Sequence, residues 1–406
     1  MKWEKVKLSE VTEYITDGDH QPAPKSDSGV LFVKIKDIQD NRLTFDNALF
    51  VPQEYYNRLP KNRKAEYGDT LYTVVGSYGI PAFVNHNIPF CFERNIALLH
   101  PNNRVIPKYL YYAVNNPIFY GNANNIANGS AQKLIPLSKL AGMEISVPPI
   151  ERQETIVNIL SAYDDLIENN QKQIKLLEEA AQRLYKEWFI DLRFPGHENV
   201  KIVDGVPEGW ERMVLSEVTS ILKRGISPKY SDNGKYSVIN QKCIRSSIMD
   251  ISESRRQEKE YVPTLNLQDS DTVICSTGTG TLGRVGRVYG DYPNTTFDSH
   301  VTLVRAKENP NYIYHVVKSQ QEYLMGMGRG STNQQELYRD VIERLVVLCP
   351  SQDILLKAER VLNAIHCKIK AVYLQNNLLV ESRDRLLPKL MSGEVEVLSL
   401  IHISEP

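Results

Sequence analysis

Residues 150–190 read IERQETIVNILSAYDDLIENNQKQIKLLEEAAQRLYKEWFI, without a proline or glycine. A seam that steps by alternating four and three residues runs through this stretch, at Ile156, Leu160, Tyr163, Ile167, Asn170, Ile174, Leu177, Ala181, Leu184 and Trp188. This spacing is typical of a coiled-coil helix. At about 1.5 Å per residue such a helix is about 60 Å long. It cannot bury its seam alone, so the stretch predicts a partner helix.

The partner is predicted near the end of the same chain, at about 351–390. Its seam has the same spacing, with Arg383 as an interruption, at Ala358, Leu362, Ile365, Ile369, Val372, Asn376, Leu379, Leu386 and Leu390. We expect the two helices to pair antiparallel. Asn170 and Asn376 would then face each other and fix the register, although a buried asparagine pair costs stability. The alternative is that either asparagine merely faces solvent.

The residues before the first long helix and those before the second form an internal sequence repeat. The stretch LSEVT occurs at 8–12 and again at 215–219, and Trp3-Glu4 recurs as Trp210-Glu211. Further pairs keep the same order: Asp69-Thr70 and Asp271-Thr272, Pro107-x-Tyr109-x-Tyr111 and Pro310-x-Tyr312-x-Tyr314, Gly129-Ser130 and Gly330-Ser331. The residues between these pairs diverge. A repeated frame with different contents is therefore predicted.

Short strands are predicted inside each copy, because β-branched and aromatic runs stand between Gly, Pro and Asn. They lie at 30–35, 70–75 and 96–99, and in the same order at 236–239, 272–275 and 301–304. Only one short helical stretch is expected in each copy, near 107–114 and 310–318. The predicted fold class is α+β, with two such domains in tandem and two long helices pairing as an antiparallel coiled coil.

The expected organisation follows from these patterns. It comprises a first globular domain at 1–147, a first long helix at 148–194, a linker and second globular domain at 195–350, a second long helix at 351–393, and a tail at 394–406.

Composition excludes several classes of protein. With 42% hydrophobic and 24% charged residues the chain is neither disordered nor fibrous, and no apolar run approaches the roughly 20 residues of a membrane span. The start, Met1-Lys2-Trp3-Glu4-Lys5, is unlike a secretory signal, so a cytoplasmic location is expected. Five scattered cysteines and eight scattered histidines predict no disulfide framework and no metal site. The net charge of −1 does not favour nucleic acid.

Two divergent domains alternating with two similar long helices resemble the specificity subunits of type I restriction–modification enzymes. The local carriers of this resemblance are the start at 210–218, the turn at 278–283, the helix entry VPPIERQ at 147–153 and the closing RLLPKLMSGE at 385–394. The second helix departs from the entry pattern, since Cys349-Pro350-Ser351-Gln352 lacks one proline.

The resemblance implies a non-catalytic, DNA-binding protein. Each globular domain would read one half of a bipartite, asymmetric DNA target, and the helices would set the spacer and dock two methyltransferase subunits. Nuclease/translocase subunits would complete an ATP-dependent type I endonuclease. Adenosylmethionine, ATP and magnesium would be bound by these partners and not by this chain. The alternative is a coiled-coil adaptor or a stand-alone nucleotide-binding enzyme.

Base readout needs Arg for guanine, Asn or Gln for adenine, and small polar groups on loops that reach a groove. The candidate DNA-binding residues are Ser77, Tyr78, Gln132 and Lys133 in the first domain, and Arg224, Lys242, Arg245, Thr279, Thr281, Arg284, Thr332, Asn333 and Gln334 in the second. A basic cluster that could meet phosphates adds Lys229, Arg255 and Arg256. The alternatives are ordinary turn chemistry and an ordinary solvated surface.

Two motifs suggest enzymes but lack the required context. Residues 278–283 match Gly-x-Gly-x-x-Gly, yet an alternating, strand-like run follows where a dinucleotide site needs a helix. A hairpin turn is predicted instead. Asn116-Pro117-Ile118-Phe119 approaches a methyltransferase motif but lacks its second proline, and we expect it to end the short helix that starts at Pro107.

Overall fold

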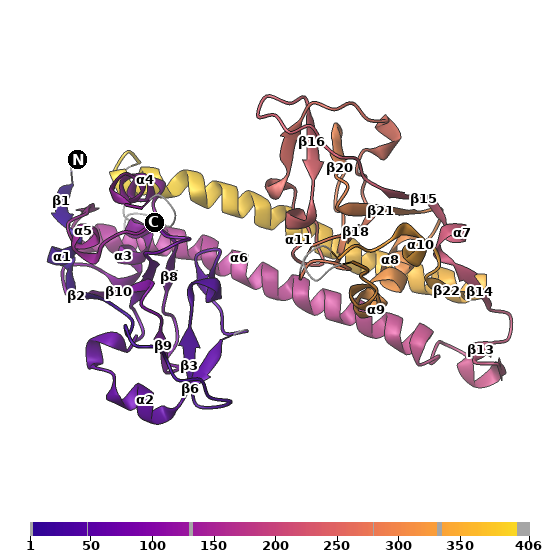
Figure 1. Ribbon diagram of the computed structural model, residues 1–406, viewed down its shortest axis with the longest axis horizontal. Helices are drawn as coiled ribbons and strands as arrows, with labels where there is room; N and C mark the ends of the chain where they lie inside the picture. The colour runs from indigo at the N-terminus through magenta and orange to yellow at the C-terminus, as the bar shows by residue number, and fades with distance from the viewer. Residues whose placement is uncertain (1–2, 47, 130–132, 279, 331–334, 396–406) are drawn as a thin grey trace, which may run out of the picture. The chain divides into compact units, whose positions relative to one another are not determined.

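The computed structural model describes residues 3–46, 48–129, 133–278, 280–330 and 335–395 (Figure 1). The chain divides into two compact units. The first unit comprises Met1–Glu168 and Asn377–Pro406, and the second comprises Asn169–Asn376. The divisions fall within the two long helices, so each unit contains one globular domain and part of both helices.

The first unit is built on a four-stranded antiparallel sheet in the order β2-β10-β7-β8 and a three-stranded sheet in the order β6-β3-β9. Its strands are β1 (Glu4–Lys7), β2 (Thr12–Asp17), β3 (Val30–Val33), β4 (Ile38–Gln39), β5 (Arg42–Leu43), β6 (Leu49–Val51), β7 (Thr70–Thr73), β8 (Pro81–Phe83), β9 (Phe90–Phe92), β10 (Ile96–Pro101) and β11 (Glu144–Val147). Its helices before the long one are α1 (Leu8–Val11), η1 (Ile35–Asp37), α2 (Gln53–Arg58), η2 (Lys61–Arg63), α3 (Pro107–Val114), α4 (Pro117–Ile126) and α5 (Leu137–Ala141).

The second unit repeats this topology with the sheets β15-β21-β18-β19 and β17-β16-β20. Its strands are β12 (Ile202–Val203), β13 (Val206–Pro207), β14 (Glu211–Val214), β15 (Thr219–Arg224), β16 (Tyr236–Ile239), β17 (Arg255–Gln257), β18 (Thr272–Cys275), β19 (Val285–Arg287), β20 (Thr295–Phe297), β21 (Val301–Ala306) and β22 (Val346–Cys349). Its short helices are η3 (Lys186–Ile190), η4 (His197–Asn199), α7 (Leu215–Val218), η5 (Gln241–Cys243), η6 (Ile251–Glu253), η7 (Pro263–Leu265), α8 (Pro310–Ser319), α9 (Gln321–Gly326) and α10 (Arg339–Glu343).

Strand pairing confirms that the two units repeat one fold. In both units the central strand of the three-stranded sheet has one antiparallel and one parallel neighbour. β3 pairs antiparallel with β6 and parallel with β9, and β16 pairs antiparallel with β17 and parallel with β20. In both, the repeated LSEV turn is held by its glutamate, because Glu10 accepts from Lys7 N at 3.0 Å and Glu217 accepts from Val214 N at 2.9 Å. The predicted α+β fold with two tandem domains is confirmed.

The two long helices are α6 (Ile150–Tyr185), which η3 continues to Ile190, and α11 (Gln352–Ser392). In the first unit Leu160 shares a core with Leu387 and Leu390, and one turn later Asp164 pairs with Arg383 at 2.9 Å. Residue numbers therefore fall along α11 as they rise along α6, so the helices run antiparallel. All positions of the predicted seams are buried or half-buried.

The expectation of one short helix per domain is wrong. α4 and α5 follow α3 in the first unit, and α9 and α10 follow α8 in the second. α4 contains Gly121, Asn122, Asn124 and Asn125, which are poor helix formers, so its composition indicates a loop. Packing overrides this preference, because Phe119 and Ala123 are buried in the domain core.

The strand predicted at 30–35 is too long at its C-terminal end. β3 ends at Val33, and the chain turns into η1 because Asp37 accepts a hydrogen bond from Lys34 N at 2.8 Å. The strands predicted at 236–239 and 272–275 have the predicted bounds.

Candidate nucleic-acid interface

A tight turn at the end of β7 and β18 has the same backbone hydrogen bond in both units. Gly79 N donates to Thr73 O at 2.8 Å in the first unit, and Gly283 N donates to Cys275 O at 2.8 Å in the second. Gly79 and Gly283 have φ values of +85° and +76°, which favour glycine. The second turn is longer, and its side chains differ from those of the first.

The start of β10 and of β21 is anchored to this turn in the same way. Val74 N donates to Asn95 O at 2.9 Å, and Ser276 N donates to His300 O at 2.7 Å. Asn95 and His300 therefore occupy equivalent positions, each directly before a central strand. The frame brings an amide to one position and an imidazole to the other.

A short hairpin completes the frame. In the first unit Asn128 and Leu134 exchange backbone hydrogen bonds of 2.9 and 2.8 Å, and in the second Arg329 and Glu336 exchange bonds of 3.0 and 2.9 Å. The described residues of the hairpin, of the turn and before the central strand are together called the loop cluster of each unit: 75–79, 94–95, 128–129 and 133–134 in the first, and 277–278, 280–284, 299–300, 329–330 and 335–336 in the second.

The loop cluster of the first unit brings two predicted residues together. Tyr78 donates a hydrogen bond to Asn124, and Lys133 Nζ lies 3.1 Å from the same Asn124 oxygen and 5.9 Å from the Tyr78 ring centroid. Tyr120 stacks on Tyr78 with a centroid distance of 6.2 Å. Ser77 is exposed at the tip of the turn. The result is an exposed group of aromatic, amide and ammonium side chains.

Arg224, at the end of β15, reaches the loop cluster of the second unit. Its guanidinium donates from Nε to Ser299 O at 2.5 Å and forms an ion pair with Glu336. Because Arg224 is committed to these contacts, it holds the hairpin in place. A direct role in reading bases would require this ion pair to open.

The longer turn of the second unit is closed by its own threonine. Thr281 Oγ1 donates to Thr277 O at 3.0 Å, and Thr277 Oγ1 hydrogen-bonds His300 Nδ1 at 2.5 Å. Arg284 is half-buried where the turn enters β19, and its carbonyl accepts from Cys275 N at 2.9 Å. The predicted hairpin is confirmed, since β18 and β19 pair antiparallel on either side of this turn.

The structure does not bring all the predicted residues into the loop clusters. Lys242 is exposed on η5, next to Gln241, which lies beside the turn at Gly278. Arg245 instead pairs with Glu253 at 3.7 Å. Five predicted residues lie outside the described residues: Gln132, Thr279, Thr332, Asn333 and Gln334.

The basic cluster of the second unit is partly neutralised. Lys229 pairs with Glu258 at 2.8 Å, whereas Arg256 is exposed and donates to Ser237 Oγ at 3.2 Å. Arg255 lies over the ring of Tyr230, 3.6 Å from its centroid. Arg255 and Arg256 on β17 are therefore cations available at the surface.

Several residues of the loop clusters were missed from the sequence. Tyr120 and Asn124 lie on α4, which was not predicted, so nothing indicated that they reach Tyr78. Asn95 and His300 could have been found, because Phe92-Glu93-Arg94-Asn95 and Phe297-Asp298-Ser299-His300 are equivalent stretches before matched strands.

A buried acid supports the second loop cluster. Asp298 accepts from His300 N at 2.8 Å and from Tyr230 at 3.4 Å. Burial raises the pKa of Asp298, while the hydrogen bond from His300 N and the charge of the His300 ring lower it. The carboxylate thus orients the loop that presents His300.

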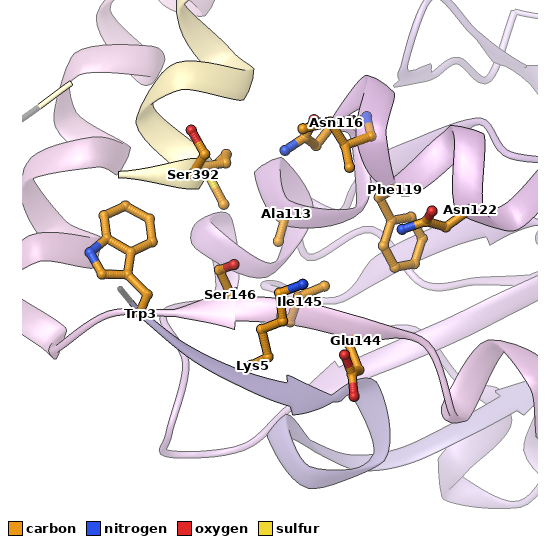
Figure 2. A pocket seen from close by; sticks show the side chains of 12 residues that line it. Trp3, Lys5, Ala113, Asn116, Phe119, Asn122, Glu144, Ile145, Ser146 and Ser392 are labelled. Atoms are coloured by element: carbon orange, nitrogen blue, oxygen red, sulfur yellow. Dashed lines mark hydrogen bonds between the residues drawn. The ribbon is translucent and has the colours of Figure 1, made fainter. Parts of the chain in front are cut away.

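The Asn-Pro motif at 116–119 is structural. Asn116 Oδ1 accepts from Ile118 N at 3.0 Å and caps α4, and Phe119 is buried. The motif therefore starts α4, whereas we expected it to end the helix from Pro107. Asn116 also lines a cavity of about 280 Å³ in the first unit, which Figure 2 shows beside Trp3, β1, β11 and the end of α11. Lys5 and Glu144 are the charged residues of its lining.

Across the described residues, no group of three or more His, Cys, Asp or Glu side chains is placed to hold a metal ion. Within the same ranges, no helix has both the length and the apolar character needed to cross a membrane.

Comparison with known proteins identifies the repeated domain. The family model described as the type I restriction modification DNA specificity domain matches residues 1–179 and 207–354. The type I restriction enzyme MjaIX specificity subunit of Methanocaldococcus jannaschii is 28% identical over 324 residues, which cover 76% of this chain and 74% of the relative. The HindI specificity subunit of Haemophilus influenzae is 22% identical and covers 90% of this chain and 94% of its own length.

Among solved structures, the S subunit of a type I restriction–modification system from M. genitalium has a TM-score of 0.56. It is 17% identical, and the match covers 98% of this chain and 97% of that chain. This likeness concerns the fold. The matched family model describes a recognition domain and not a catalytic one, and the match occurs once in each globular domain. The chain therefore belongs to the type I restriction modification DNA specificity domain family and acts in DNA target recognition.

Proposed function

We propose that this chain reads a bipartite, asymmetric DNA target, one half with each globular domain. The observation that supports this proposal is the pair of loop clusters, which share a hydrogen-bonded frame but carry different side chains. Asn95 and Lys133 stand on the first frame and His300 on the second, where Arg224 holds the hairpin. Two loop clusters with the same backbone but different side chains suit a target whose halves differ, because base identity is read by side-chain chemistry.

The helices α6 and α11 set the spacer between the half-sites in this proposal. A helix of 36 residues is about 54 Å long, which exceeds one DNA turn of about 34 Å. The same helices dock two methyltransferase subunits, and nuclease/translocase subunits join the complex. Adenosylmethionine, ATP and magnesium are bound by these partners.

Methylation mapping of DNA tests the proposal. DNA is exposed to the candidate methyltransferase subunit with and without this chain, and modified positions are mapped. We expect modification at a two-part sequence only when the chain is present. Modification that is independent of the chain, or that follows a single continuous sequence, would contradict the proposal.

A ligand-binding measurement separates the chain from a stand-alone enzyme. The chain alone is titrated with adenosylmethionine and with ATP by calorimetry. We expect binding of adenosylmethionine only after the methyltransferase subunit has been added. Tight binding of either ligand by the chain alone would favour the enzyme alternative.

A further inference from the structure

The first unit contains an open hollow of about 430 Å³ beside its loop cluster. Its floor is apolar and includes Phe32, Leu49 and Phe50, with Pro22 and Pro24 from the loop after β2. β3 and β6, which carry Phe32, Leu49 and Phe50, lie at the end of the domain away from α6 (Figure 1). Asn95 of the loop cluster also lines the hollow, so the two are continuous.

The apolar floor is unusual for its place in the fold. Leu49 and Phe50 are each 36% exposed on β6, which is an edge strand of the sheet β6-β3-β9. Edge strands generally avoid exposed apolar side chains because these promote unwanted strand pairing. Exposed apolar groups retained at such a position indicate a binding surface.

Cations surround the hollow. Lys25 and Arg94 are exposed and Lys34 is half-buried, and all three contribute to its lining. The acids of the lining have partners within the protein, because Asp19 pairs with Arg63 at 3.2 Å and Glu93 accepts from Ile35 N at 2.7 Å. The rim is therefore suited to an anionic ligand, and the floor to an apolar one.

The described edge strand of the second unit differs from β6 at the positions of the apolar floor. Strand register places Leu49 opposite Phe32 in the first unit and Arg255 opposite Val238 in the second. Phe32 and Val238 are themselves equivalent positions. Each stands one residue before the last residue of the parallel pairing, which is Val33 with Phe92 in the first unit and Ile239 with Phe297 in the second. Where the first unit exposes Leu49, the second unit carries Arg255, which lies over the Tyr230 ring.

We propose that this hollow is a nucleobase site of the first domain, which rests on the proposed DNA-reading function. One base of the target, turned out of the stack, packs its face on Leu49 and Phe32, which lie on one face of the sheet because they are paired across β6 and β3. Lys34 and Arg94 neutralise the phosphates on either side of that base. Aromatic platforms with a cationic rim bind unstacked nucleotides in this way, and stacking of one base contributes about 1–3 kcal/mol. A protein partner would not require three cations around an apolar floor.

The test uses the full chain and a duplex that contains its mapped target. 2-Aminopurine, which becomes more fluorescent when unstacked, replaces one base at a time in the half-site of the first domain. We expect increased fluorescence at one position when wild-type chain binds. The double variant L49S/F50S should abolish this increase and weaken binding of the duplex about tenfold or more.

The matched control is Ile88→Ser, because Ile88 is 51% exposed in the same domain and does not line the hollow. It should retain both the affinity and the fluorescence increase. Two results would overturn the proposal: no increase at any position although wild-type chain binds the duplex, or an L49S/F50S variant that loses the methyltransferase subunit but not DNA. If wild-type chain, alone and with its methyltransferase subunit, does not bind a bipartite duplex, the proposed function itself fails.

Discussion

At the scale of single residues, the two domains differ in the side chains that a shared backbone presents. The first loop cluster has Tyr78, Asn124 and Lys133 in mutual contact, and the second has Thr277 hydrogen-bonded to His300. Tyr78 and Lys133, which the sequence suggested as separate candidates, lie together in the structure. Arg224 was predicted to bind DNA. In the structure its ion pair with Glu336 holds the hairpin.

Replacing Lys133 by Ala tests base reading in the first domain. We expect binding to weaken by about 1–3 kcal/mol at the preferred sequence and preference at one position of the first half-site to relax. Lys139→Ala, an exposed lysine on α5, is the control. Affinities are measured by fluorescence anisotropy over a set of single-base variants and over salt concentration. A uniform loss across sequences, with a salt slope smaller by about 0.9, would identify a phosphate contact instead.

A buried histidine pair in the second unit predicts a pH dependence of stability. His315 and His366 lie with their Nε2 atoms 3.0 Å apart, and Tyr289 hydrogen-bonds His366 Nδ1 at 2.7 Å. Burial lowers the pKa of His315 to about 3 and that of His366 to about 2. The unfolded chain binds protons at these residues below about pH 6.5, whereas the folded chain does not. Their contribution to stability is thus complete above pH 6.5 and is lost as the pH falls toward 3.

Urea unfolding at pH 7 and pH 5 measures this loss. For each pH unit below 6.5, each histidine lowers the free energy of unfolding by up to about 1.4 kcal/mol. The variant H315Q/H366Q should lose distinctly less stability than wild type between these pH values. His20→Gln, at an exposed histidine, should behave as wild type. Equal pH dependence in the double variant and wild type would refute the assignment.

At the scale of elements, the seam residues of the two helices were enough to predict their length and antiparallel pairing. The repeat was enough to predict that both domains share one topology. The extra helices α4, α5, α9 and α10 could not be predicted from local sequence. The composition of α4 indicates a loop, and α5, α9 and α10 have 5, 6 and 5 residues, too few for a helical period to show. For the same reason the contact between α4 and the turn at Tyr78 was not foreseeable.

The register role of the asparagines is a prediction at this scale. Asn170 and Asn376 are each 7% exposed, and Asn170 Nδ2 donates to Gln375 Oε1 at 3.4 Å. The double variant N170L/N376L should raise the thermal unfolding temperature, because buried amides cost stability relative to leucine. Differential scanning fluorimetry checks this, with N169L/N377L at neighbouring exposed positions as the control. A lower unfolding temperature for N170L/N376L would contradict the register role.

At the scale of the whole molecule, the chain repeats one architecture and varies its surface chemistry. Matched backbone hydrogen bonds, matched sheet orders and one long helix after each domain constitute the constant part. The variable part comprises the loop clusters and the edge strands, where Leu49 and Phe50 in the first unit stand against Arg255 and Arg256 in the second. This separation supports two independent readers whose specificities can change without a change of fold.

The most direct measurement replaces the first domain, residues 1–145, by the corresponding domain of a relative and maps DNA methylation with the methyltransferase subunit present. We predict that one half of the split target changes while the other half and the spacer length stay the same. A target that does not change, or that changes on both sides, would contradict the account of two independent readers on a helical spacer.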